Sequence, residues 1–230
     1  MRDAQHSTPV AGGSGSADTK SRLLDAAEQL FAERGFEGTS MRAVTQLAGA
    51  AVSAANYHFG SKQDLLHATL RRHIEPINRC RLERLEALER GGRSPTLEEV
   101  LDAFLRPPLD QQAEARRSRV GDSRVRQLAV RLFADAPEQV APLRTELFGE
   151  VNRRFRAALA RALPTASAEV LSLILQLAVG LLMHTASGHV DPELARATLL
   201  PEAAGSDALP RTLVRFSAAG ARALASRADA

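Results

Sequence analysis

Hydrophobic residues recur along most of the chain at the three- and four-residue spacing of helices. Between Thr19 and Arg34 they form one apolar stripe, and Gly35 follows as a helix stop signal. Two shorter helical segments occupy residues 40–59, and another helix starts after Gly60-Ser61. Because β-branched and aromatic residues are sparse, strands are not expected. The pattern therefore predicts an all-α protein.

The chain beyond residue 62 is predicted to be helical, with breaks at Pro76, Gly91-Gly92 and Pro107-Pro108. The expected helices cover residues 62–74, 76–90, 96–106, 123–135, 139–163, 168–187 and 207–227. Residues 111–122 lack apolar periodicity and are expected to form a polar, mobile connection.

One predicted helix, at residues 168–187, is long and strongly apolar, and residues 170–190 carry no charge. Polar side chains, among them Gln176 and His184, interrupt the apolar run before it reaches the length of a membrane span. A buried core helix or a dimer helix is therefore predicted, and no membrane partner is expected.

Composition and charge narrow the class of protein. The 230 residues carry a net charge of +3 and one cysteine, Cys80, so no intrachain disulfide can form, which is typical of a reducing compartment. Residues 1–18 are small and polar without the apolar core of a signal peptide, and they are predicted to be a disordered tail. A cytoplasmic location is expected. No acidic residue lies between Glu37 and Asp64, which suits contact with nucleic acid.

This acid-free stretch contains a predicted helix-turn-helix between Ser40 and Phe59. Gly49 lies in the tight turn, where a side chain would be costly. Val44, Leu47 and Ala55 are expected to form the small core between the two helices. The second helix would then be free to enter a DNA major groove.

Exposed side chains of this motif are candidate DNA contacts. Val52, Ser53 and Asn56 share one face of the second helix and could touch base edges, since Asn bonds adenine bidentately. Candidates for phosphate contacts are Ser40, Arg42, Tyr57 and Lys62. His58 is assigned equally to a phosphate contact or to packing beside Phe59. From spacing alone, the alternative is a surface helical hairpin with solvated side chains.

Residues 19–66 resemble the DNA-binding domain of the TetR family of bacterial transcriptional repressors. The resemblance rests on LLDAAEQLFAERGFEGTSMRAV, on LAGA and on NYHFGSKQDLL. It implies a homodimer with a three-helix DNA-binding head, a linking fourth helix, and a larger body that dimerises and binds an effector.

The resemblance also assigns roles to individual residues. The family's phosphate contacts fall on Thr39 or Ser40, Arg42, Tyr57 and Lys62, and its base-reading positions fall on Val52, Ser53 and Asn56. Where many members cap the recognition helix with Ser, Thr or Asn, this chain has Ala51. That departure removes a frequent phosphate contact.

The expected organisation is a tail (residues 1–18), a helix-turn-helix domain (19–62) and a helical effector-binding and dimerisation domain (63–230). No catalytic, cofactor or metal-ligand motif appears, so the chain is predicted to be no enzyme and to carry no cofactor or metal.

The predicted function is that of a cytoplasmic repressor, a homodimer paired through residues 139–187, that binds double-stranded operator DNA. An unknown small-molecule effector of hydrophobic character would release it, bound among the helices of residues 76–163 with 111–122 as a gate.

Two other functions stay open at this stage. One is a ligand-independent architectural or cell-division protein that binds DNA, and the other is an enzyme that carries a helix-turn-helix. An apolar cavity in the body would favour the repressor over the architectural protein. Turnover of a bound ligand would favour the enzyme.

Overall fold

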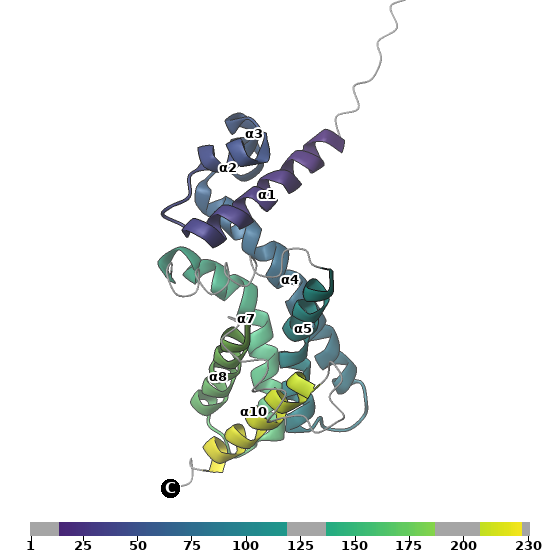
Figure 1. The fold of residues 1–230 in the computed structure, drawn as a ribbon. Helices are drawn as coiled ribbons and strands as arrows, with labels where there is room; N and C mark the ends of the chain where they lie inside the picture. Colours follow the sequence, from purple (N-terminus) through teal and green to yellow (C-terminus); the bar gives the residue numbers. More distant parts are fainter. Residues whose placement is uncertain (1–13, 119–136, 187–207, 227–230) are drawn as a thin grey trace, which may run out of the picture. The chain divides into compact units, whose positions relative to one another are not determined.

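The structure, a computed structural model, describes residues 14–118, 137–186 and 208–226, and every element in these ranges is a helix (Figure 1). In chain order they are α1 (Ser14–Arg34), α2 (Met41–Ala48), α3 (Val52–Phe59), α4 (Lys62–Glu89), α5 (Leu97–Ser118), α7 (Pro137–Ala162), α8 (Ala168–Ala186) and α10 (Ala208–Ser226). The all-α prediction is confirmed. The helix expected at residues 123–135 lies outside the described residues.

The first of two compact units extends to Thr69 and contains α1, α2, α3 and the start of α4. The apolar stripe of α1 is buried in it, and so are Leu65 and Leu66 of α4. The unit therefore reaches further along α4 than the expected boundary after Lys62. Helix α1 begins at Ser14, inside the predicted tail, and an ion pair of 3.2 Å between Asp18 and Arg22 supports this added turn.

The second unit begins at Leu70 and contains the rest of α4 together with α5, α7, α8 and α10. Its core lies between α5 and the helices that pack on it, with the rings of Phe104 and Phe155 in an edge-on contact at 5.1 Å. Helix α8 is long and apolar enough to cross a membrane, with a mean hydropathy of 1.6 over Ala168–Thr185. One face of α8, which includes Ile174 and Ala178, is buried in this core.

The prolines do not break the helices, so this part of the prediction is wrong. Helix α4 runs through Pro76, and α5 runs through Pro107 and Pro108 to Ser118. The expected mobile connection at 111–122 is therefore helical as far as Ser118, and residues 119–122 lie outside the described ranges.

A buried arginine explains how α5 passes its second proline. Pro108 has no N–H, so the carbonyl of Phe104 lacks its helical donor. Arg81 of α4 is only 4% exposed, and its Nε donates a hydrogen bond of 2.8 Å to that carbonyl. Its guanidinium also lies 4.1 Å from the centre of the Phe104 ring, and burial lowers the pKa of Arg81 to about 10.

The same arginine joins three helices of the second unit. Arg81 Nη1 donates to Asn78 Oδ1 at 3.2 Å, and Asn78 Nδ2 donates to the carbonyl of Leu147 in α7 at 2.7 Å. The chain of hydrogen bonds thus connects α5, α4 and α7 through buried groups, where an unpaired partner would be costly.

Candidate nucleic-acid interface

Local signals build the helix-turn-helix as the sequence predicts. Ser40 caps α2, since its Oγ accepts a hydrogen bond of 3.1 Å from the N–H of Ala43. Gly49 ends α2 in the left-handed conformation, with φ of 60°. Val44 and Ala55 are fully buried between the helices, as predicted. Leu47 is 48% exposed, so the prediction that it belongs to this core is wrong.

Helix α3 presents the predicted base-reading residues to solvent. Val52, Ser53 and Asn56 are all exposed, whereas Ala55 and Phe59 on the other face are buried. The N-terminus of α3, at Ala51, has no side-chain cap, in keeping with the departure from the family pattern. The exposed face thus carries the polar Ser53 and Asn56 beside the apolar Val52, and a large partner can reach it.

The remaining α3 candidates differ in exposure. Tyr57 is exposed over 84% of its surface, so its hydroxyl can reach a partner. His58 is partly buried and lies edge-on to Tyr57 at 5.3 Å and beside Phe59 at 6.0 Å. In this structure His58 therefore packs against the rings of Tyr57 and Phe59.

Two predicted phosphate contacts are occupied within the chain. Thr39 is 2% exposed, and its Oγ1 donates to the carbonyl of Gly35 at 2.8 Å. Lys62 donates from Nζ to the carbonyl of Phe36 at 3.0 Å and lies over the Phe36 ring at 4.1 Å. Both side chains hold the loop between α1 and α2. Of the alternatives Thr39 and Ser40, only Ser40 is exposed.

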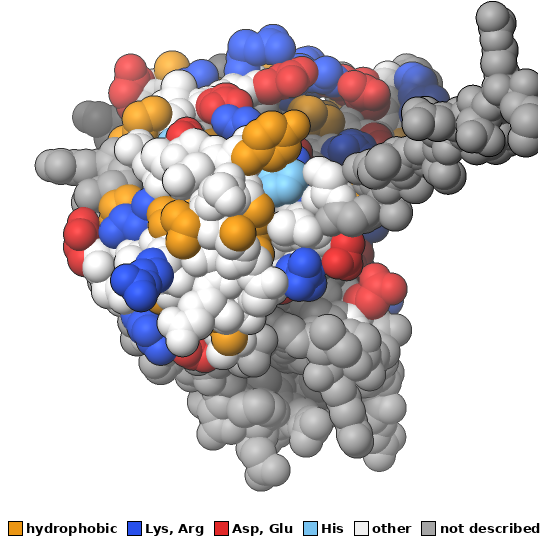
Figure 2. Space-filling model, turned by 90° about the horizontal axis from the view of Figure 1, so that it is seen from above, with side chains coloured by type: hydrophobic (Ala, Val, Ile, Leu, Met, Phe, Trp, Pro, Cys, Tyr) orange, Lys and Arg blue, Asp and Glu red, His pale blue; other side chains and the backbone are white. Residues whose placement is uncertain are grey.

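The charges of the helix-turn-helix suit a polyanion. Arg42 is exposed on α2, and no carboxylate occurs between Glu37 and Asp64. The Asp64 carboxylate accepts a hydrogen bond of 2.6 Å from Ser61 at the start of α4. Figure 2 shows one face of the molecule on which uncharged side chains and a histidine occupy the middle, while acidic side chains lie toward the margins. A negatively charged backbone would meet little repulsion there.

An arginine that the sequence did not single out holds the turn of the motif. Arg22 of α1 donates from Nη1 to the carbonyl of Ala48 at 3.0 Å and to that of Gly49 at 3.5 Å. Its Nη2 reaches the hydroxyl of Thr19 at 3.3 Å. These carbonyls end α2 and precede α3, so Arg22 sets where α3 starts. No local pattern could reveal this contact, because the partners lie 26 and 27 positions away in the chain.

Arg22→Met should loosen α3 without unfolding the unit. We expect amide exchange of α3 to accelerate and affinity for duplex DNA to fall about fivefold, which is about 1 kcal/mol, because two carbonyls lose a charged donor. Lys20→Met is the matched control, since it removes the same charge from an exposed position of α1. Equal effects of the two variants on affinity and exchange would show that only charge, and no positioning, is involved.

Comparisons with known proteins show which family models match this chain. Residues 23–69 match the family model described as bacterial regulatory proteins, tetR family. Residues 102–220, more than half of the chain, match the model described as tetracyclin repressor-like, C-terminal domain.

Individual proteins are similar over less than a third of the chain. The chain is 33% identical over 69 residues to the HTH-type transcriptional repressor KstR2 of Rhodococcus jostii, which covers 30% of this chain and 34% of that protein. It is 34% identical over 62 residues to the HTH-type transcriptional repressor AcnR of Corynebacterium glutamicum, with 27% and 33% covered. The matches span about a third of the length of these curated relatives.

Solved structures extend the similarity of fold to most of the chain. The crystal structure of the transcriptional regulator FadR from Bacillus subtilis in complex with stearoyl-CoA gives a TM-score of 0.62 at 14% identity. The alignment covers 87% of this chain and 98% of that one. At this identity, the similarity shows the fold of both units and no more.

Proposed function

This chain belongs to the TetR family of bacterial regulatory proteins, and we propose that it is a transcriptional regulator, a repressor that a small molecule releases from its operator. The observation that carries the proposal is the exposed face of α3, which lies within a stretch without carboxylates. The relatives reported above are repressors and a regulator, and we propose no catalytic activity. The site of action is the cytoplasm, where a bacterial operator lies.

In this proposal α3 enters the major groove. Asn56 bonds an adenine edge, Ser53 bonds a neighbouring base and Val52 contacts a thymine methyl group. Ser40 and the free N–H groups at the start of α2 bind a phosphate, with Arg42 beside them. Support comes from the exposure of these side chains and from the Ser40 cap, which marks the start of α2.

Release follows from geometry. Two recognition helices of a dimer must stand about 34 to 36 Å apart to enter successive major grooves. Helix α4 is continuous from Lys62 to Glu89, so it begins in the first unit and ends in the second. A ligand that binds one position of α4 better than another changes the population with the correct spacing. The effector in this proposal is a small molecule with a substantial hydrophobic part. It can release the DNA only if its affinities for the two states of the protein differ.

The proposed dimer uses an apolar face that the single chain leaves uncovered. On α8, Leu173, Leu177 and Val179 are exposed, and Leu177 is the most exposed of them, at 56%. Phe216 of α10 is 70% exposed, and α10 packs against α8. The solvent side of α7 instead carries charged residues, among them Arg153 and Arg156. The interface predicted at residues 139–187 involves α7 and α8. We therefore retain α8 in the proposed interface and replace α7 by α10.

Substitution of Asn56 tests base reading. Asn56→Ala should weaken binding to the preferred operator by about 1 to 3 kcal/mol and relax the preference at one base position. Arg42→Ala should instead weaken binding to all sequences and lower the salt slope by about one ion. Selection from a random DNA pool, followed by salt titrations, measures both. An unchanged sequence preference in Asn56→Ala would refute the base-reading role.

A further inference from the structure

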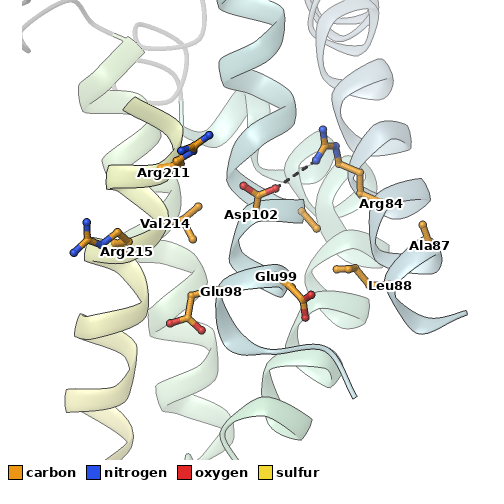
Figure 3. A pocket seen from close by; sticks show the side chains of 10 residues that line it. Arg84, Ala87, Leu88, Glu98, Glu99, Asp102, Arg211, Val214 and Arg215 are labelled. Carbon is orange, nitrogen blue, oxygen red and sulfur yellow. Dashed lines mark hydrogen bonds and ion pairs between the residues drawn. The ribbon is translucent and has the colours of Figure 1, made fainter. Parts of the chain in front are cut away.

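A groove of about 590 Å³ lies on the second unit, between α4, α5 and α10. In Figure 3, α5 forms the middle of the groove, Arg84 and Leu88 project from α4 on one side, and Val214 and Arg215 project from α10 on the other. A volume of this size is typical of small-molecule sites. Helix α10 lies outside residues 76–163, where the sequence placed the effector cavity.

The groove is open because its central side chains are small. Ala103 of α5 is 2% exposed, and Val214 of α10 faces the same space. Ala87 and Leu88 of α4 complete the apolar lining. Such a lining favours an apolar ring or chain, which would be removed from water between the helices.

The carboxylates of the groove are already neutralised. Glu98 forms an ion pair of 2.6 Å with Arg222, and Glu99 forms one with Arg93. Hydrogen bonding to Arg222 lowers the pKa of Glu98, and hydrogen bonding to Arg93 lowers the pKa of Glu99 to about 2. Both carboxylates are therefore ionised at neutral pH, and each is already paired with an arginine of this chain.

The third carboxylate, Asp102, is also paired, at 2.7 Å from Arg106 and 3.4 Å from Arg84. On the opposite wall, Arg215 is exposed and forms no ion pair with any residue in the described part of the chain. Arg211 stands one turn before it on α10 and also lines the groove. The wall formed by α10 thus offers a guanidinium group at the edge of the apolar lining.

We propose that this groove binds an amphipathic organic anion. Its apolar part lies against Ala103 and Val214, and its carboxylate, sulfonate or phosphate group pairs with Arg215. Because Arg84, Ala87 and Leu88 belong to α4, the bound anion contacts the helix that begins in the DNA-binding unit. That this anion acts as the effector rests on the function proposed above, whereas the binding of the anion in the groove does not depend on that function.

A pair of fluorescent probes isolates the anionic group. Anilinonaphthalene sulfonate and the uncharged N-phenylnaphthylamine share one aromatic body, and both become fluorescent in apolar sites. Titrated into the full-length protein, the sulfonate should bind at least about tenfold more tightly than the neutral probe, since it forms a charge-assisted contact. Equal affinities would overturn the assignment of an anion.

Variants locate the bound probe. Arg215→Glu should lower the affinity for the sulfonate about tenfold or more and leave that for the neutral probe unchanged. Ala87→Phe, at an exposed position of the groove wall, should reduce the affinity for both probes by filling the space. Arg79→Glu, an exposed position of α4 that does not line the groove, is the matched control. Undiminished sulfonate binding in Arg215→Glu and Ala87→Phe would overturn the site.

The effector role is measured apart from binding, with a labelled operator duplex selected from a random pool. Saturating sulfonate should lower operator affinity in the wild type, and this effect should vanish in Arg215→Glu. Sulfonate that binds in the groove without changing operator affinity would overturn the effector role alone. Failure to select any DNA would refute the proposed function while leaving the groove assignment intact.

Discussion

Leu177→Arg should convert the protein into a folded monomer and lower its operator affinity by at least about a hundredfold, because a single head loses the gain of binding two half-sites together. Leu177 is 56% exposed in the single chain, so an arginine there remains in water and leaves the core intact. In the proposed dimer the same guanidinium would be desolvated against an apolar surface. Light scattering measures the mass, and thermal unfolding checks that the monomer stays folded.

A substitution on α7 distinguishes the two interfaces. Ala157 is exposed on α7, and Ala157→Arg introduces the same side chain on that helix. If α8 and α10 form the interface, Ala157→Arg stays dimeric. A monomer in Ala157→Arg would restore α7 to the interface, and a dimer in Leu177→Arg would exclude the exposed face of α8 from it. A wild-type monomer at micromolar concentration would refute the dimer altogether.

Arg81→Leu should lower the free energy of unfolding by about 2 to 4 kcal/mol, since it leaves buried polar groups without donors. The carbonyl of Phe104 would lose the bond that replaces the missing N–H of Pro108, and the Oδ1 of Asn78 would lose its donor. The loss of the contact between the guanidinium and the Phe104 ring adds to the cost. Denaturant unfolding followed by circular dichroism measures the change.

The proline provides the control for this explanation. Pro108→Ala restores an N–H that can bond the Phe104 carbonyl within α5. Its stabilising effect should therefore be larger in the Arg81→Leu background than in the wild type, by about 1 to 2 kcal/mol. Equal effects in both backgrounds would show that Arg81 does not act through that carbonyl.

The sequence by itself determined the helix-turn-helix, because its signals are local. The Ser40 cap, the left-handed Gly49 and the burial of Ala55 opposite Asn56 all depend on residues within a few positions of one another. The family motif lies on the same segment, so the candidate DNA contacts could be named. Helical periodicity also predicted most of the remaining helices, since apolar residues at helical spacing need only one covered face.

The tertiary structure alone decided how several of these residues are used. Thr39 turns inward, Lys62 bonds the carbonyl of Phe36, and Arg22 reaches the turn of the motif from α1. Arg81 lets α5 continue past Pro108, where the sequence indicated a break. The last three contacts join residues 23 to 26 positions apart. Their partners are backbone carbonyls, which every residue carries, so no sequence pattern could identify them before packing brought the helices together.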